Sequence, residues 1–317
     1  MSAVPAPAPV YTFLGPEGTF TEAALLQVPG AGQARRIPAT SVTAALELVR
    51  SGGADAAVVP IENSVEGGVS ATLDAISAGS SLRILREILV PITFVLSVRP
   101  GLELADIRSV STHSHAWAQC RSWAAAHIPE AEYVPASSTA AAAVGLAGER
   151  PGYDSAISAP FVAEKLGLDV LAKDIGDVAD AVTRFVLISR PGDLPEPTGA
   201  DKTTLVVPLP DDHPGALMEM LGHFSTRGVN LSRIESRPTG QYLGDYFFSI
   251  DADGHILDAR MAAALKGLHR ISPGLRFLGS YPRADGREHT VARHNRNEAF
   301  EAADAWFEGL VRGEEQG

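Results

Sequence analysis

The sequence lacks the features that define several large classes of protein. One cysteine, Cys120, stands among 317 residues, which excludes an internal disulfide framework and a cysteine-based zinc cluster. The nine histidines show no HExxH or similar ligand spacing, so no metal site is expected. No apolar run approaches the roughly 18 residues that a membrane-spanning helix needs. The net charge of −12 argues against a nucleic-acid partner, which is usually met by a basic face.

The N-terminal segment, residues 1–10, lacks the basic and apolar regions of a secretory signal. Its alternating alanines and prolines predict a short disordered arm of extended character. We therefore expect a cytoplasmic protein. The chain as a whole has a globular composition, with 45% hydrophobic and 20% charged residues, and its length indicates roughly two domains.

Residues 11–190 alternate short apolar runs with alanine-rich helical stretches, which predicts an α/β domain with mixed or mainly parallel sheets. The expected strands are 11–14, 56–59, 92–98, 107–111, 155–157 and 185–189, and the expected helices are 21–27, 42–51, 116–127, 138–147 and 159–166. Residues 191–202 are rich in proline, glycine and charge, and we expect them to form a linker between domains.

A second domain is expected over residues 203–282, where strand-like and helix-like segments follow the ferredoxin-like order βαββαβ. Its expected strands are 203–209, 231–237, 245–251 and 275–281, its helices are 215–227 and 257–268, and its central turn is Thr239–Gly240. The tail, residues 283–317, is expected to carry a docked amphipathic helix. The apolar residues at helical spacing there are Phe300, Ala303, Phe307 and Leu310.

A glycine-rich turn precedes the first expected helix. Thr19 and Glu22 have capping-box spacing, so the helix is expected to begin there. The backbone amides near Gly18 and Thr19 would form a site for a carboxylate or phosphate. A capped helix after a tight turn, without any ligand, explains the same residues equally well.

Glu62, Asn63 and Ser64 follow a buried strand, at the position where open α/β sheets present side chains to a crevice. Asn63 can both donate and accept hydrogen bonds, which suits a substrate of mixed polarity. The alternative is that these side chains cap the next helix or hold a turn.

A third strand end is followed by Thr112 and His113 at the start of an expected helix, with Gln119 two turns further along. His113 and His115 are spaced i,i+2 and do not share a helix face, so metal binding by this pair is disfavoured. Cys120 is expected to be a buried small hydrophobic residue.

Thr183 and Arg184 stand at the mouth of an apolar strand, where the guanidinium offers a fork of donors to a carboxylate. The alternative is a structural ion pair, which a single arginine forms more often than a contact with substrate. Taken together, the four segments indicate a crevice rich in hydroxyls and amides without a strong base, metal or cofactor motif. Such a site orients a small polyanion whose own chemistry drives the reaction.

These segments resemble the prephenate dehydratase family. The matching stretches are YTFLGPEGTFTEAA, VVPIENSVEGGV, STHSHAWAQC, SSTAAAA and TRFVLISR, and the second domain resembles an ACT module through HPGALMEMLGHFSTRGVNLSRIESRP. The resemblance implies a two-lobed catalytic domain like type II periplasmic binding proteins, with the active site between the lobes. It departs from the family at Ala181, where asparagine is common, and at Ser114 and His115.

The resemblance also implies roles for particular residues. The catalytic candidates are Thr183, Asn63, Gln119 and Thr112, and the substrate-binding candidates are Arg184, Phe185, Gly18, Thr19, Ser138, Thr139, Glu62 and Ser64. The candidates for binding L-phenylalanine as an allosteric inhibitor are Gly215, Ala216, Leu217, Met218, Asn230, Leu231, Ser232, Glu235, Ser236, Arg237 and Pro238. A homodimer or homotetramer is implied as well.

The implied reaction is the loss of water and carbon dioxide from prephenate to give phenylpyruvate, in phenylalanine biosynthesis. Aromatisation drives this reaction, so no cofactor is expected. Two alternatives remain at this stage. One is arogenate dehydratase, which performs the same elimination on a substrate with an amino group, and the other is an amino-acid sensor without catalytic activity.

Overall fold

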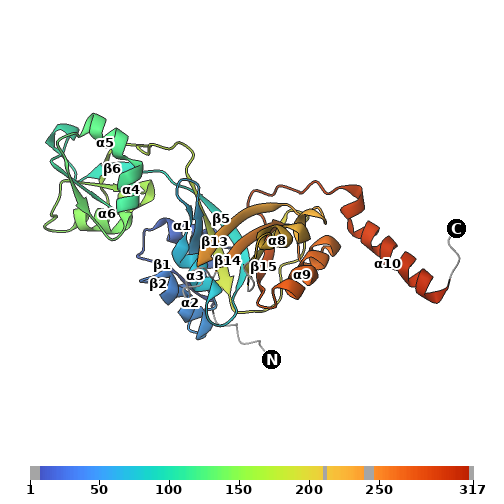
Figure 1. Ribbon diagram of the computed structural model, residues 1–317. Coiled ribbons are helices and arrows are strands. Elements are labelled where there is room, and N and C mark those ends of the chain that lie inside the picture. Colours follow the sequence, from blue (N-terminus) through green and yellow to red (C-terminus); the bar gives the residue numbers. More distant parts are fainter. Residues whose placement is uncertain (1–7, 210–212, 239–245, 314–317) are drawn as a thin grey trace, which may run out of the picture. The chain divides into compact units, whose positions relative to one another are not determined.

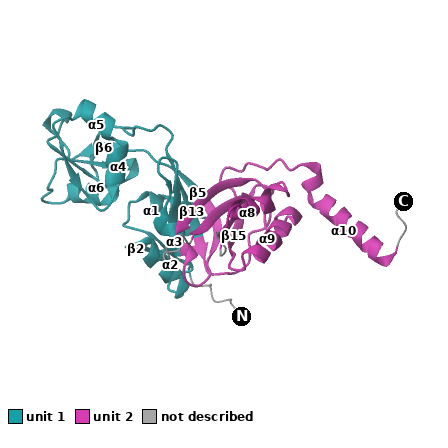
Figure 2. Cartoon of the chain, in the orientation of Figure 1, with its two compact units in different colours: residues 1–75, 88–187 teal, residues 76–87, 188–317 magenta. Residues whose placement is uncertain are grey.

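The computed structural model describes residues 8–209, 213–238 and 246–313 (Figure 1). The chain forms two compact units (Figure 2), of which the first takes in residues 1–75 and 88–187 and the second residues 76–87 and 188–317. Within the described ranges, no helix has the length and apolar character that crossing a membrane requires.

The first sheet has the strand order β2-β1-β3-β11-β5, and β4 pairs with the end of β3. Its strands are β1 (Val10–Leu14), β2 (Arg35–Ala39), β3 (Ala56–Asn63), β4 (Gly67–Gly68), β5 (Arg83–Pro91) and β11 (Val182–Ser189). The helices that follow β1, β2 and β4 are α1 (Phe20–Leu26), α2 (Val42–Arg50) and α3 (Ser70–Ser77) (Figure 1). Because β1 runs parallel to β2 and β3, their carboxyl ends meet at one edge of the sheet.

The second sheet has the order β10-β6-β9-β7-β8 and is mixed, since β7 is parallel to β8 and β9 while β6 is antiparallel to β9 and β10. Its strands are β6 (Val95–Val98), β7 (Ser109–Thr112), β8 (Glu132–Pro135), β9 (Ser155–Ser158) and β10 (Asp169–Ala172). Its helices are α4 (Ser114–Gln119), α5 (Arg121–His127), α6 (Thr139–Ala147) and α7 (Pro160–Lys165). Small buried alanines on α6 and α7 let these helices pack closely on the strands.

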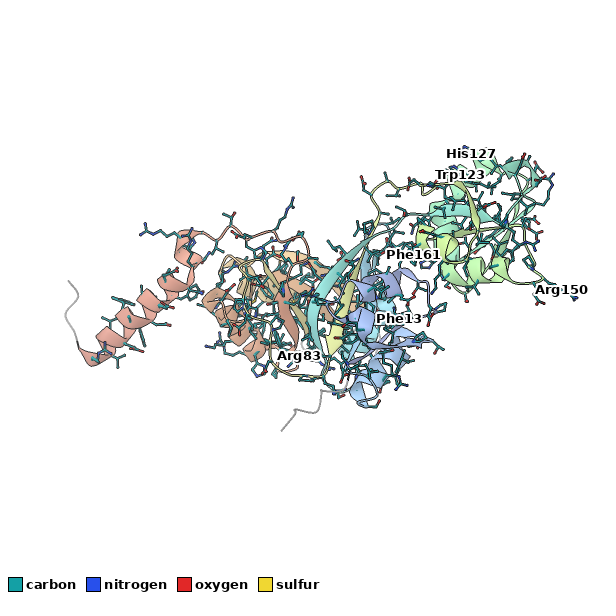
Figure 3. The ribbon with its side chains drawn as sticks, turned by 180° about the vertical axis from the view of Figure 1, so that it is seen from behind. Phe13, Arg83, Trp123, His127, Arg150 and Phe161 are labelled. Atoms are coloured by element: carbon teal, nitrogen blue, oxygen red, sulfur yellow. The ribbon has the colours of Figure 1, made fainter. Side chains whose placement is uncertain are left out.

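The helix predicted over 116–127 is interrupted at Cys120 and forms α4 and α5. The carboxylate of Asp177 accepts from the amides of Ser122 and Trp123 at 3.1 and 3.3 Å, and so caps the start of α5. On α5, Trp123 and His127 lie next to each other (Figure 3), with ring centroids 4.5 Å apart. Because the cap comes from a distant loop, the local pattern did not reveal the interruption.

Two segments of the chain join the two lobes of the first unit, and they are hydrogen-bonded to each other. The amide of Ile92 donates to the carbonyl of Ala181 at 2.7 Å. The amide of Ile175 donates to the carbonyl of Phe94 at 3.1 Å. The strand predicted over 92–98 is therefore shorter than expected, since residues 92–94 belong to the connection and β6 begins at Val95. The two-lobed architecture implied by the resemblance is confirmed.

The second unit contains an antiparallel sheet of order β13-β14-β12-β15. Its elements are β12 (Asp201–Pro208), α8 (Ala216–Ser225), β13 (Leu231–Pro238), β14 (Tyr246–Asp253), α9 (Ala259–Ile271) and β15 (Arg276–Pro282). The predicted order βαββαβ is confirmed, and the apolar faces of α8 and α9 supply Met220, Phe224, Met261 and Leu268 to its core. The predicted turn at Thr239–Gly240 lies outside the described residues.

The segment predicted as a linker ends earlier than expected, because β12 begins at Asp201. Asp201 and Lys202 are both buried in spite of their charge. The Asp201 carboxylate accepts from Thr198 and Gly199, and the Lys202 ammonium lies 2.8 Å from the carboxylate of Glu87. Asp201 and Lys202 stand in a polar stretch that favoured a linker in the sequence. Their burial is possible because distant residues supply hydrogen bonds and an opposite charge.

The predicted helix of the tail is present as α10 (Asn297–Arg312). The predicted docking of its apolar face is not seen in the single chain. Trp306 is 58% exposed, Phe307 is 61% exposed and Val311 is 74% exposed. An amphipathic pattern reveals which face of a helix is apolar, but not whether the same chain covers that face.

Candidate active site

A cleft of about 580 Å³ lies in the first unit and takes residues from both of its lobes. Its size suits a small organic ligand. Seven predicted residues of the site line it together, namely Thr19, Asn63, Gln119, Ser138, Thr139, Thr183 and Phe185, of which Phe185 adds an apolar wall. These residues come from strand ends and helix starts, as expected for ligand sites in open α/β sheets.

The closest polar contact among the predicted catalytic residues joins Asn63 and Thr183. The Asn63 amide nitrogen Nδ2 donates to the Thr183 hydroxyl Oγ1 at 3.1 Å. The Asn63 oxygen Oδ1 accepts from the amide of Val65 at 2.7 Å, which fixes the orientation of the side-chain amide. Because Thr183 accepts from Asn63, its own hydroxyl proton is left for donation to a ligand.

Ser64 holds this pair of strands together and does not line the cleft. Its amide donates to the carbonyl of Val182 at 2.9 Å, and its hydroxyl accepts from the amide of Val182 at 3.0 Å. The two bonds tie the end of β3 to the start of β11, and so place Asn63 beside Thr183. The structure thus shows a structural role for Ser64, and its predicted contact with substrate stays a prediction.

Arg184 and Glu62 form an ion pair instead of lining the cleft. Successive residues of a strand point to opposite faces, so Arg184 points away from the side shared by Thr183 and Phe185. Its Nε lies 3.0 Å from a carboxylate oxygen of Glu62, and the Arg184 side chain is only 6% exposed. The structure shows the alternative of a structural ion pair, and the substrate-binding role of both residues stays a prediction.

The start of α1 is already occupied by an internal anion. The amide of Gly18 donates to the Glu22 carboxylate at 2.6 Å, and the other oxygen of Glu22 lies 3.1 Å from Arg36. The Thr19 hydroxyl accepts from the amide of Glu22, so the predicted helix start is confirmed. Thr19 lines the cleft, but Gly18 does not, and its amide is not available to substrate.

Thr112 is fully buried behind the cleft, and its hydroxyl donates to the carbonyl of Ile157 at 2.8 Å. This bond ties β7 to β9, and Thr112 does not line the cleft, so its catalytic role stays a prediction without a contact to the cleft. Gln119, at the end of α4, does line the cleft. Its backbone carbonyl accepts from the amide of Asp177, which anchors α4 to the segment that leads into β11.

The start of α6 faces the cleft with Ser138 and Thr139. The Ser138 hydroxyl accepts from the amide of Ala141 at 2.9 Å and caps the helix, which has nine residues. A helix N-terminus carries a partial positive charge that favours an anion nearby. The positions of both residues in the cleft agree with the predicted binding role.

Three ionisable side chains of the cleft were not assigned a function from the sequence. His115 Nδ1 lies 2.7 Å from the Glu66 carboxylate, and His113 Nδ1 accepts from the amide of His115 at 3.3 Å. Burial, followed by the neighbouring His115, lowers the pKa of His113, and Glu66 partly opposes this shift. The two histidines suggested a metal or acid–base role, of which metal binding was disfavoured, and Glu66 gave no local signal because it comes from a turn on the other lobe.

Aromatic side chains form the apolar part of the cleft. Phe20 makes edge-to-face contacts with Phe94 and Phe161, at ring-centroid distances of 5.9 and 6.2 Å. Phe20, Phe94 and Phe185 line the cleft together with Ile92. Cys120 is buried, and burial raises the pKa of its thiol to about 12, so it has the inert character expected from the sequence.

The predicted allosteric residues are divided between two cavities of the second unit. Gly215, Ala216, Leu217 and Ser236 line a cavity of about 190 Å³, whereas Asn230 and Ser232 line another of about 410 Å³. At Gly215 φ is +99°, and the space where a Cβ would project is open, so a ligand can approach the backbone there.

The remaining predicted allosteric residues lie in neither cavity. Met218 is 71% exposed, Leu231 packs on the core, and Glu235 lies 3.1 Å from Arg233 in an ion pair. Arg237 and Pro238 end β13.

The fold and the cleft define a class of protein with a two-lobed α/β unit for a small ligand and a ferredoxin-like module. A family model described as prephenate dehydratase matches residues 11–193. The chain belongs to the prephenate dehydratase family. This confirms the resemblance drawn from the motifs and the inference of a lyase.

Individual relatives agree with this membership. The prephenate dehydratase of Mycolicibacterium vanbaalenii is 46% identical over 318 residues, which cover 96% of this chain and 99% of the relative. A solved structure of prephenate dehydratase from Arthrobacter aurescens in complex with L-Phe is 68% identical, with a TM-score of 0.91 and coverage of 96% and 99%. GqqA, described as a novel type of quorum quenching acylase, is 31% identical, with a TM-score of 0.77 and coverage of 88% and 100%.

Proposed function

We propose that this chain converts prephenate to phenylpyruvate, water and carbon dioxide in the cleft of its first unit. The hydrogen bond from Asn63 to Thr183 is the observation that carries the proposal, because it leaves a hydroxyl donor facing a cleft of suitable size. The family membership agrees with this reaction. We further propose that the protein acts in the cytoplasm, as expected for an enzyme of amino-acid biosynthesis.

The difficult step is the departure of hydroxide from the ring carbon opposite the carboxylate. The bond from the ring to the carboxylate breaks, its electron pair enters the ring, and the carbon–oxygen bond breaks with its pair on oxygen. Thr183 donates a hydrogen bond to that oxygen as its negative charge develops. A threonine hydroxyl is too weak an acid to give up its proton outright, and the Gln119 amide is no stronger, so the proton that completes water comes from solvent while these side chains donate hydrogen bonds.

The apolar wall favours departure of carbon dioxide. Phe20, Phe94 and Phe185 offer a substrate carboxylate little solvation, which destabilises its charge and favours the neutral product. The starts of α3 and α6 also line the cleft, and their partial positive charge favours the second carboxylate of the substrate.

We propose that L-phenylalanine inhibits the enzyme by binding to the ferredoxin-like module. The relative from Arthrobacter aurescens is described in complex with L-Phe, and it is 68% identical to this chain. Six of the predicted effector residues are divided between two separate cavities of one chain. A second copy related by a two-fold axis supplies the missing half reciprocally, so we propose a homo-oligomer with the effector between copies.

A direct turnover assay tests these proposals. Purified protein is given prephenate, phenylpyruvate is followed, and the assay is repeated with L-phenylalanine and with arogenate in place of prephenate. We expect turnover of prephenate that L-phenylalanine suppresses. Preferential turnover of arogenate would overturn the substrate assignment, and L-phenylalanine binding without turnover of either compound would overturn the catalytic proposal in favour of a sensor.

A further inference from the structure

One cavity of the second unit is lined in part by a segment to which the proposed function assigns no role. Residues 283–296 follow β15 and lead to α10, and we call this segment the strap. The cavity of about 410 Å³ takes Asn230 and Ser232 from the start of β13, and His289 and Thr290 from the strap. The structure therefore places the strap beside two residues that were predicted to bind L-phenylalanine.

The strap is fixed to the ferredoxin-like module by hydrogen bonds. The amide of Arg283 donates to the carbonyl of Ala200 at 2.8 Å. The ring nitrogen Nε2 of His289 lies 2.7 Å from the carbonyl of Asp201, and because a carbonyl only accepts, Nε2 is the donor. The His289 side chain is only 11% exposed, although the strap is mostly an exposed segment. These bonds anchor the strap at defined points of the module.

Asp253, the last residue of β14, connects the strap to Asn230. One of its carboxylate oxygens accepts from the Arg283 guanidinium at 3.1 Å, and the other accepts from Asn230 Nδ2 at 2.7 Å. The backbone amide of Asp253 also donates to the carbonyl of Asn230 at 2.8 Å. Asp253 is 6% exposed, so its charge is buried beside the Arg283 cation.

The contact with Asp253 determines how the Asn230 side chain is turned. A carboxylate only accepts, so the NH2 group of Asn230 faces Asp253 and leaves the oxygen Oδ1 on the opposite side of the amide. Asn230 is an exposed residue, so packing does not hold its side chain in place. An amino acid presents an ammonium group that only donates, and an oriented amide oxygen is a matching acceptor.

We propose that the strap belongs to the effector site, and that Asp253 is a positioning residue that presents Asn230 Oδ1 to the ammonium group of L-phenylalanine. The inference rests on the proposed inhibition by L-phenylalanine, and it adds the residues that orient one contact of that ligand. Arg283 acts through Asp253, because a buried carboxylate keeps its charge only beside a cation.

The first arm of the test is Asp253→Asn in the full-length protein. The variant keeps the shape of the side chain, but its amide can present a donor or an acceptor, so Asn230 loses its single orientation. We expect the dissociation constant of L-phenylalanine in calorimetric titration to rise about tenfold, as for a lost hydrogen bond to a charged group. Asp193→Asn, at an exposed aspartate of the linker, is the control and should bind like the parent. Equal dissociation constants for Asp253→Asn and the parent would overturn the proposal.

A double-mutant cycle separates positioning from a general structural role. Asn230→Ala changes an exposed residue, and it should also raise the dissociation constant about tenfold. Adding Asp253→Asn to Asn230→Ala should raise it by less than about twofold more, because Asp253 acts through the missing amide. A double variant in which the two effects multiply would contradict the positioning role.

The last arm tests the strap and does not depend on the folding of Asp253→Asn. Arg283→Gln keeps a donor but removes the cation beside Asp253, and should raise the dissociation constant about threefold or more. Unchanged binding of L-phenylalanine by Arg283→Gln would exclude the strap from the effector site.

Failure of the proposed function gives a different result. A parent protein that does not turn over prephenate would reject the reaction, and a parent that L-phenylalanine neither binds nor inhibits would reject the proposed inhibition. The positioning role fails by itself when the parent is inhibited and the Asp253 and Arg283 variants are inhibited at the same concentration of L-phenylalanine.

Discussion

A single side-chain amide determines how Thr183 can act. Asn63 is fixed by the backbone amide of Val65, and this fixed amide donates to the Thr183 hydroxyl. Because a hydroxyl has one proton to give, accepting from Asn63 directs that proton to another acceptor. The neighbouring residues of both motifs make structural contacts, as Ser64 does with Val182 and Arg184 with Glu62.

Removal of the Thr183 hydroxyl is expected to affect turnover and not folding. Thr183→Ala should lower kcat about a hundredfold or more, because the departing hydroxide loses its hydrogen-bond donor. Thr183→Ser keeps the hydroxyl and should stay within about tenfold of the parent. Steady-state kinetics with prephenate measure kcat of both variants, and thermal unfolding is the control for their folding. Normal turnover by Thr183→Ala would remove Thr183 from the mechanism.

The thiol of Cys120 is expected to resist modification in the native protein. Burial raises its pKa to about 12, so at pH 8 only about one thiol in ten thousand is the reactive thiolate. Incubation with iodoacetamide followed by mass spectrometry should show labelling only in guanidinium chloride. Rapid labelling of folded protein, with loss of turnover, would contradict the buried environment.

At the scale of elements, distant contacts decided several boundaries that local patterns did not reveal. Asp177 caps α5 from a loop, and Glu87 on β5 allows Lys202 to be buried at the start of β12. The strands and helices with strong periodicity were predicted well because each buries one face. Edge strands such as β2 and β8 were not predicted, since half-exposed strands have a weaker apolar pattern.

Lys202 and Glu87 form a buried ion pair in the second unit, and we expect their contributions to the free energy of unfolding to be strongly coupled. Lys202→Ala leaves a carboxylate that is 3% exposed without its cation, and should lower the free energy of unfolding by about 3–5 kcal/mol. The double variant Glu87→Gln with Lys202→Met should lose much less of the free energy of unfolding, because neither position of the pair then carries a buried charge. Urea unfolding measures both, and Arg312→Ala in an exposed pair is the control. Equal losses for the single and double variants would contradict the coupling.

Gly279 in β15 is expected to tolerate no side chain. Its φ of +142° disfavours other residues, and a Cβ there would overlap the backbone of Ile84. Gly279→Ala should therefore destabilise the protein by about 3 kcal/mol or more. Gly286 also has a positive φ, +62°, but has open space around it, so Gly286→Ala should cost only about 1 kcal/mol. A similar melting temperature for both variants would show that the close approach is absent in solution.

At the scale of the whole molecule, apolar side chains remain exposed on the second unit of the single chain. Ile234 is 42% exposed and Met218 is 71% exposed, and on α10 Trp306 and Phe307 are exposed as well. Exposed apolar surface of this extent is typical of a contact with another protein. This agrees with the proposed homo-oligomer.

A charge on this surface is expected to weaken both assembly and regulation. Ile234→Glu should shift the protein toward a smaller species in sedimentation velocity at micromolar concentration, because the carboxylate would be desolvated between copies. The concentration of L-phenylalanine for half-inhibition should rise about tenfold in parallel. Leu257→Glu, at another exposed apolar residue, is the control. Unchanged sedimentation and inhibition would contradict the location of the interface on β13.

The sequence by itself determined the family, the α/β character of the first domain and the βαββαβ module, and it selected Thr183 and Asn63 as catalytic candidates, because ordered motifs and periodicity are local properties. Only the tertiary structure decided which neighbours of those residues face the cleft. Arg184 points away from the cleft because successive residues of a strand face opposite sides, and it pairs with Glu62. The Thr112 hydroxyl donates to a backbone carbonyl, and the Glu22 carboxylate accepts from the amide of Gly18 at the start of α1. It also brought Glu66 to His115 from another lobe. Pairing across such sequence distances depends on how the strands cross, which no local pattern records.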